Sequence, residues 1–111
     1  KIAVLSTEIG EITGETADLL YELREEATRV PETAMDALLT DDSDEAVELA
    51  SKARAQIREV DDTTRQVDKQ VREADPQSAQ VLGLVVDSLS RTADYGGNIA
   101  ESALQKAAPR P

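Results

Sequence analysis

The sequence predicts an all-α protein, an antiparallel up-down-up bundle of three long helices that forms one domain over residues 1–111. Apolar residues recur at gaps of three and four along three long segments, which is the spacing of one helix face. The links between the segments are short, and short links favour antiparallel neighbours. Polar and apolar residues do not alternate over the length of a strand, except in residues 1–5, which could end an upstream strand.

The first helix is expected over residues 2–39, with a heptad-like apolar seam along one face. The seam consists of Ile2, Leu5, Ile9, Ile12, Thr16, Leu19, Leu23, Ala27, Val30, Ala34 and Leu38. Pro31 lacks a backbone N–H and its ring crowds the preceding turn, so a kink or break is expected near this residue.

The second helix is expected over residues 43–74, with Asp42 or Ser43 as its N-cap. Asp42 followed three residues later by Glu45 resembles a capping box, in which each side chain would bond the other residue's backbone N–H. The seam consists of Ala46, Ala50, Ala53, Ile57, Val60, Thr64, Val67, Val71 and Ala74.

The third helix is expected over residues 76–107, because Asp75 is a suitable N-cap and Pro76 suits the first helical position. Its seam consists of Leu82, Val85, Leu89, Thr92, Gly96, Ile99 and Ala103. Gly96 falls on this seam, which favours close approach of another helix. Threonines occur in all three seams and could form one polar layer; they are Thr16, Thr64 and Thr92. The two tyrosines, Tyr21 and Tyr95, are expected at the bundle edge.

The composition argues against an enzyme. The chain has no Cys, His, Trp or Phe, so it lacks disulfides, the usual zinc ligands and the commonest general base. Acidic residues outnumber basic ones 23 to 12, which makes binding of nucleic acid through this segment unfavourable. The longest apolar run, residues 81–86, is too short for membrane insertion. The acidic surface fits either a halophilic cytoplasm or an ordinary acidic helical domain.

A line of polar residues runs along the third helix, offset by two positions from the seam, and should lie on the face away from it. The line consists of Asp87, Arg91, Asp94, Asn98 and Glu101. One interpretation is a solvated face with pairs within the helix, from Arg91 to Asp87 and from Arg91 to Asp94. The other is a contact surface in which Asn98 and Glu101 reach a neighbouring bundle.

Residues 89–101 read Leu-Ser-Arg-Thr-Ala-Asp-Tyr-Gly-Gly-Asn-Ile-Ala-Glu. This resembles the signature helix of the PhoU family of phosphate-uptake regulators, Leu-Glu-Arg-Ile-Gly-Asp-His-Ala-x-Asn-Ile-Ala-Glu. The matching residues are Leu89, Arg91, Asp94, Asn98, Ile99, Ala100 and Glu101. A weaker similarity lies in the second helix, where residues 61–68 correspond to a usual Asp-Asp-Glu-Val-Asp-x-Leu-Glu. The resemblance covers about residues 15–104, one three-helix repeat.

The resemblance implies a regulator without enzymatic activity that contacts a phosphate-importing ABC transporter and a sensor kinase. It implies a cytoplasmic location, membrane-peripheral through the transporter. Such proteins usually carry two bundles in tandem, so a second PhoU-like bundle is an expected partner, in cis or in a homodimer. The start at Lys1 rather than Met suggests a piece of a longer protein, similar to the C-terminal bundle of archaeal relatives.

The family's acidic pairs, four residues apart, can hold iron or zinc clusters, but both pairs are incomplete in this chain. They have become Asp61 with Arg65 and Ser90 with Asp94, which leaves Asp61 and Asp94 as weak metal candidates. No metal or other cofactor is therefore expected. Two alternative functions remain open beside phosphate regulation, a generic helical adaptor or dimerisation module and a carboxylate-type metal-binding bundle.

Overall fold

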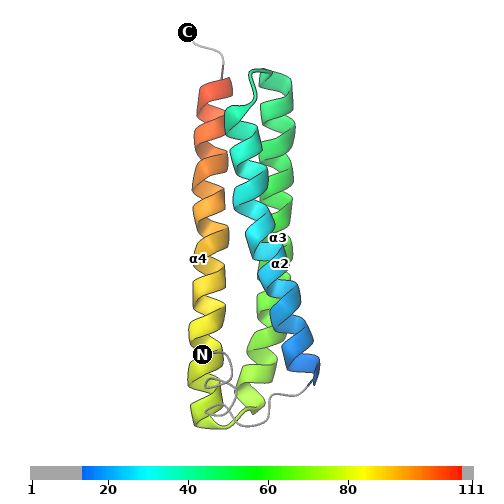
Figure 1. Ribbon diagram of the computed structural model, residues 1–111, viewed down its shortest axis with the longest axis vertical. Coiled ribbons are helices and arrows are strands. Elements are labelled where there is room, and N and C mark those ends of the chain that lie inside the picture. The colour runs from blue at the N-terminus through cyan, green and yellow to red at the C-terminus, as the bar shows by residue number, and fades with distance from the viewer. Residues whose placement is uncertain (1–13, 109–111) are drawn as a thin grey trace.

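The three expected helices are present and pack against one another pairwise, which confirms the all-α bundle. The computed structural model describes residues 14–108, and the molecule is elongated, with extents of 57 × 25 × 20 Å. The chain runs up through α2 (Gly14–Leu39), down through α3 (Ser43–Glu73) and up again through α4 (Pro76–Ala107) (Figure 1). Within residues 14–108 no helix is long and apolar enough to cross a membrane.

Of the kink or break expected at Pro31, the break does not occur, because α2 continues through this residue as one helix. Tertiary packing outweighs the local cost, because Val30 and Ala34 on either side of this proline are fully buried. The first part of the expected helix, residues 2–13, and the suggested strand at residues 1–5 lie outside the described residues.

Helices α3 and α4 begin at the expected caps. The Asp42 carboxylate accepts hydrogen bonds from the backbone N–H groups of Asp44 and Glu45, at 2.9 and 3.2 Å. The second bond of a capping box is replaced, because the Asp42 N–H donates to the Thr40 hydroxyl rather than to Glu45. At α4 the Asp75 carboxylate accepts from the Ser78 N–H at 2.9 Å, and the hydrogen bonds from the Ser78 side chain and from this N–H lower the pKa of Asp75.

The core is built mainly from small side chains. Within residues 14–108, nine of the fifteen buried hydrophobic residues are alanines, and the largest fully buried side chains are Leu23, Val30, Val60 and Val67. Small residues allow the backbones of neighbouring helices to approach closely. The buried residues include all the predicted alanines of the α3 seam except Ala74, which is half-buried.

The buried face of α4 is rotated from the predicted seam. Val86, Ala93 and Ala100 are buried, whereas the predicted Val85, Thr92 and Ile99 are only half-buried. One helix in a three-helix bundle contacts two neighbours, so it buries a wider face than a single seam of a coiled coil. Leu82, Gly96 and Ala103 belong to both sets and are buried as predicted.

The closest approach between α2 and α4 occurs at Gly96. A Cβ atom added to this glycine would lie 2.6 Å from the backbone nitrogen of Pro31 and from a Val30 methyl group. Real Cβ atoms do not approach other atoms so closely. Close helix packing at Gly96 is therefore confirmed, and it occurs at the position where a proline interrupts the hydrogen bonding of α2.

The expected layer of three threonines does not form. The Thr16 hydroxyl donates to the Gln70 side chain of α3 at 3.0 Å, whereas the Thr92 hydroxyl bonds the Ser88 carbonyl of its own helix. Thr64 has a buried hydroxyl oxygen with no hydrogen-bond partner. Thr16 lies opposite Gln70, more than a turn of α3 away from Thr64, so the three residues do not share one level.

A buried carboxylate lies between α2 and α3. Glu26 is only 9% exposed, and one of its carboxylate oxygens has no hydrogen-bond partner. Burial raises the pKa of Glu26, and the nearby carboxylates of Glu22 and Glu59 raise it further. A hydrogen bond from Thr63 and the charge of Arg29 act in the opposite direction but do not cancel the rise.

Candidate functional site

The predicted polar line is exposed along α4. All five of its members, Asp87, Arg91, Asp94, Asn98 and Glu101, are exposed to solvent. Behind the second half of this line, the buried residues of α4 are small: Ala93, Gly96, Ala100 and Ala103. The line is not a uniform outward face, however, because its two halves have different surroundings.

The first half is a pair within the helix. The Arg91 guanidinium lies 3.0 Å from the Asp87 carboxylate, and both side chains are more than half exposed. Arg91 pairs with Asp87 one turn earlier in the helix, and Asp94 lies with the second half of the line. An exposed i,i+4 pair stabilises a helix by roughly 0.2–0.5 kcal/mol, so this pair contributes little to the stability of the fold.

The second half faces a groove between α3 and α4. Asp94, Asn98 and Glu101 line this open groove of about 480 Å³ from α4, together with Gly97. The opposite wall comes from α3 and consists of Arg54 and Ile57. Three of the five predicted residues are thus brought together beside α3, rather than on the face opposite the bundle.

An ion pair closes one end of the groove. The Arg54 guanidinium of α3 donates to the Glu101 carboxylate at 3.1 Å, which connects residues 47 positions apart in the chain. The groove stays open beside this pair because Gly97 has no side chain. A Cβ atom at Gly97 would lie 3.1 Å from the terminal methyl carbon of Ile57.

Sequence reasoning missed the α3 wall of the groove. Arg54 follows Ala53 in a run of small and charged residues, Ser-Lys-Ala-Arg-Ala, and nothing in this run distinguishes it from any exposed arginine. Ile57 was assigned to the predicted seam and is half-buried. Only the pairing of α3 with α4 places Arg54 opposite Glu101, and this pairing depends on tertiary packing.

The two metal candidates have different surroundings, since Asp94 lines the groove and Asp61 does not. Asp61 is exposed on α3, and the Arg65 guanidinium one turn later pairs with Asp62. Among residues 14–108 there is no group of three or more acidic, His or Cys side chains that could hold a metal ion. Ser90, which takes the place of the family's acidic residue on α4, is half-buried.

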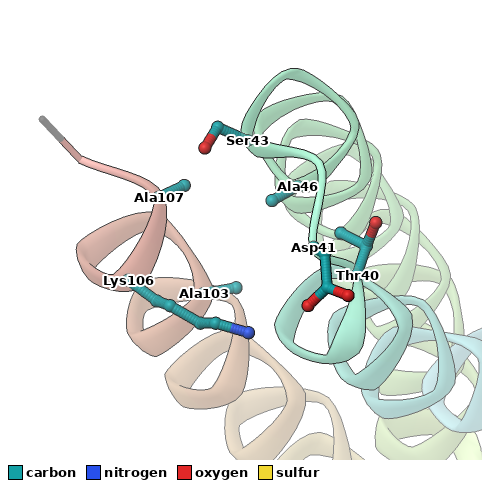
Figure 2. Close-up of a pocket in the computed structure, with 7 residues that line it drawn as sticks. All are labelled: Thr40, Asp41, Ser43, Ala46, Ala103, Lys106 and Ala107. Carbon is teal, nitrogen blue, oxygen red and sulfur yellow. The ribbon is translucent and has the colours of Figure 1, made fainter.

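A second, smaller hollow lies at the end of the bundle where α2 meets α3. Its volume is about 120 Å³, and Figure 2 shows it between the start of α3 and the end of α4. The Lys106 ammonium donates to the Leu38 carbonyl at 2.8 Å and so connects the last turns of α4 and α2. Lysine in the last helical turn is a recognisable sequence signal, because it also interacts favourably with the helix dipole.

The groove presents carboxylate and amide oxygens without a nucleophile or a histidine. Such groups can accept hydrogen bonds from backbone N–H groups, arginine or lysine, and the Asn98 amide can also donate. The arrangement is suited to contact with another polypeptide. No protein family model, curated protein or solved structure matches this chain.

Proposed function

We propose that the chain is a non-enzymatic regulator of phosphate uptake that acts through contacts with other proteins. The support is the agreement between the residue pattern of α4 and the surface that carries it. Arg91, Asp94, Asn98 and Glu101 match the PhoU signature, and they lie exposed on a three-helix bundle, which is the fold that the resemblance implies.

The observation that carries the proposal is the placement of Asp94, Asn98 and Glu101 along one groove. Side chains that served only solubility would not need to converge beside a second helix. In the proposed contact, Asp94 and Asn98 accept hydrogen bonds from cationic or backbone donors of the partner. Arg54 holds Glu101 in position at the end of the groove.

The proposed partners are those that the resemblance implies: a second PhoU-like bundle, a phosphate-importing ABC transporter and a sensor kinase. The acidic groove favours a basic segment on whichever of these docks there. The proposed location is the cytoplasm, at the membrane when the transporter is bound. Metal binding is not proposed, since Asp61 and Asp94 belong to no group of three or more ligands in the described part of the chain.

The proposal is tested by substituting Asp94→Ala, Asn98→Ala and Glu101→Ala together in the source cells. Uptake of radiolabelled phosphate is then measured in phosphate-rich and phosphate-poor media. The control variant is Asp68→Ala with Glu73→Ala, which removes two exposed acids from α3 outside the groove. We expect the groove variant to abolish most of the difference in uptake between the two media, and the control to preserve it.

Unchanged regulation in the groove variant, with the protein present at its normal level, would contradict the proposal. If the variant loses a co-purifying partner while phosphate regulation is unchanged, the chain is an adaptor of another kind. Elemental analysis of the purified protein separates both outcomes from the metal-binding alternative, which requires iron or zinc in stoichiometric amount.

A further inference from the structure

The outer surface of α2 and α4 carries most of the exposed large apolar side chains. Six such residues are exposed in the described chain, and five of them belong to these two helices. They are Tyr21, Met35 and Leu39 on α2 and Leu84 and Tyr95 on α4, all between 41% and 68% exposed. Single exposed apolar residues are ordinary, but a group along two adjacent helices indicates a contact surface.

The packing contacts show that the exposed apolar residues of α2 and those of α4 belong to one face of the bundle. Gly97 faces α3 and Gly96 faces α2, so Tyr95 lies a further 100° around α4, on its outer side next to α2. Leu84 and Lys106 are each eleven residues from Tyr95, which returns them to nearly the same side. The Lys106 ammonium does bond the Leu38 carbonyl of α2, as this placement requires.

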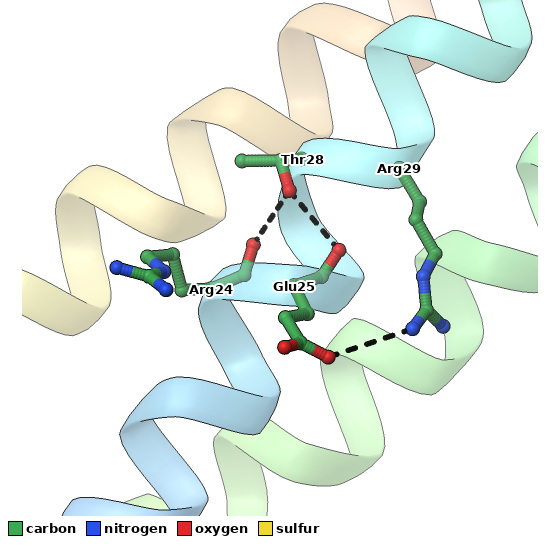
Figure 3. A network of polar contacts seen from close by, with 4 residues as sticks. All are labelled: Arg24, Glu25, Thr28 and Arg29. Atoms are coloured by element: carbon green, nitrogen blue, oxygen red, sulfur yellow. Dashed lines mark hydrogen bonds and ion pairs between the residues drawn. The ribbon is translucent and has the colours of Figure 1, made fainter.

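On α2 the residues of this face lie on the side of the helix next to α4. Pro31 contacts Gly96, and Arg24, seven residues earlier, lies near the same side. Figure 3 shows Arg24 extending toward α4, whereas Arg29 extends toward α3 and pairs with Glu25 at 3.7 Å. The Arg24 guanidinium also lies 5.4 Å from the centre of the Tyr21 ring.

This surface contains no acidic residue, although the chain has a net charge of −11. We call it the acid-free face. On α2 it consists of Tyr21, Arg24, Thr28, Met35 and Leu39. On α4 it consists of Leu84, Ser88, Tyr95, Ser102 and Lys106. With 23 acidic residues in 111, an acid-free strip along two exposed helices is a marked departure from the rest of the surface.

Acidic residues border the face on both sides at heptad spacing. Exposed acids on α2 recur every seven residues and form one border, made by Asp18, Glu25 and Glu32. The border on α4 has the same spacing and is made by Asp87, Asp94 and Glu101. An apolar strip with negative borders has the pattern of a coiled-coil seam whose flanking positions select a positively charged partner.

We infer that the acid-free face binds an amphipathic helix of another protein, one with an apolar stripe flanked by lysine or arginine. The charge pattern decides between this occupant and a second copy of the chain. Two copies joined through this face would bring acidic borders against acidic borders, which is unfavourable. From Tyr21 to Leu39 the face is about 27 Å long at 1.5 Å per residue, which accommodates a helix of about 18 residues.

The acid-free face shares only its border residues Asp94 and Glu101 with the groove between α3 and α4, and the inference does not depend on a role in phosphate uptake. The phosphate measurement and the following binding measurement can therefore fail separately. The binding measurement uses variants at Leu84, Tyr95, Asp18 and Glu32, none of which lines the groove, so helix binding by the face says nothing about phosphate.

The test uses a fluorescent 21-residue peptide with leucines at heptad a and d positions and lysines at the flanking positions. Binding to the 111-residue chain is measured by fluorescence anisotropy at 50 and 300 mM salt. A scrambled peptide of the same composition lacks the apolar stripe and controls for attraction to the net negative charge. We expect the scrambled peptide to bind at least tenfold more weakly, and the designed peptide to weaken at high salt.

Two protein variants and one matched control locate the binding. Leu84→Ser with Tyr95→Ser removes apolar side chains from the face, and Asp18→Asn with Glu32→Gln removes charges from one border. Val47→Ser changes an apolar residue of α3 that is 46% exposed and lies off the face. We expect at least tenfold weaker binding for the first variant, a smaller loss with reduced salt dependence for the second, and no change for the control.

Equal binding of the designed and scrambled peptides, or equal binding by the face variant and wild type, would overturn the inference. A dimer in sedimentation velocity that Leu84→Ser with Tyr95→Ser dissociates would assign the face to a second copy instead. Binding to vesicles of three parts phosphatidylcholine and one part phosphatidylglycerol, lost in the same variant, would assign it to a membrane surface. Circular dichroism confirms that each variant remains helical.

Discussion

Replacing Gly96 with Ala should destabilise the bundle, although alanine is the better helix former. In the middle of a helix, Ala is favoured over Gly by about 1 kcal/mol. At this position the new methyl group would lie 2.6 Å from the Pro31 nitrogen and from a Val30 methyl group. Favourable contacts between such atoms are about 3.5–4.0 Å, so α4 must move about 1 Å away from α2.

The cost of this movement decides whether Gly96→Ala stabilises or destabilises the bundle. Overpacking a well-packed core costs about 1–3 kcal/mol, and two of the obstructing atoms belong to the α2 backbone, which cannot rotate aside. The midpoint of that range, less the gain in helix propensity, gives a net loss of about 1 kcal/mol. For a domain of this size the loss corresponds to a melting temperature lower by about 4–8 °C.

Gly83→Ala is the matched control, because Gly83 lies in the same helix with nothing within 4 Å of an added Cβ. This variant should gain about 1 kcal/mol, which separates the two glycines by about 2 kcal/mol. The measurement is urea denaturation followed by circular dichroism at 222 nm. If Gly96→Ala stabilises the protein as much as Gly83→Ala does, α2 and α4 do not approach each other closely at Gly96 in solution.

Three further predictions concern charge and capping. The pKa of Glu26 is raised in the folded state, so its contribution to stability is full below its ordinary pKa of 4.5 and is lost as pH rises through the folded value. Glu26→Gln should therefore raise the melting temperature at pH 7 and flatten the change of melting temperature between pH 4.5 and 7. An unaltered pH profile in this variant would exclude Glu26 as the cause of that change. Asp42→Ala should cost about 1 kcal/mol in urea denaturation, whereas Asp41→Ala next to it should cost much less; equal effects would contradict the assigned N-cap. A double-mutant cycle of Arg54→Ala and Glu101→Ala should give a coupling of about 0.2–1 kcal/mol that falls in 1 M salt, since both side chains are more than half exposed; a larger, salt-independent coupling would show that the pair is buried in solution.

The beginnings of α3 and α4 were predictable because the signals that start a helix are local. A carboxylate at Asp42 or Asp75 satisfies free N–H groups of the first turn, whatever the rest of the chain does. Pro76 reinforces the second of these starts. Pro31 carries an equally local signal, but it does not end α2, because its cost is outweighed by packing against a helix 65 residues further along the chain.

The site was only half predictable, for a related reason. Periodicity identified Asp94, Asn98 and Glu101 as one exposed line, since helical spacing depends on α4 alone. It could not identify Arg54 as their neighbour, because that contact depends on how far α3 slides along α4 and on the rotation of both helices. The burial of Val86 and Ala93, instead of the predicted Val85 and Thr92, reflects the same undetermined rotation.

The alanine-rich core has a consequence for the temperature dependence of stability. The heat capacity change of unfolding grows with the apolar surface that becomes exposed, and alanine contributes less of this surface than leucine or phenylalanine. A core with nine alanines and no aromatic residue should therefore give a heat capacity change near the low end for its length. The resulting stability curve is shallow, so the bundle loses stability slowly on either side of its optimum temperature.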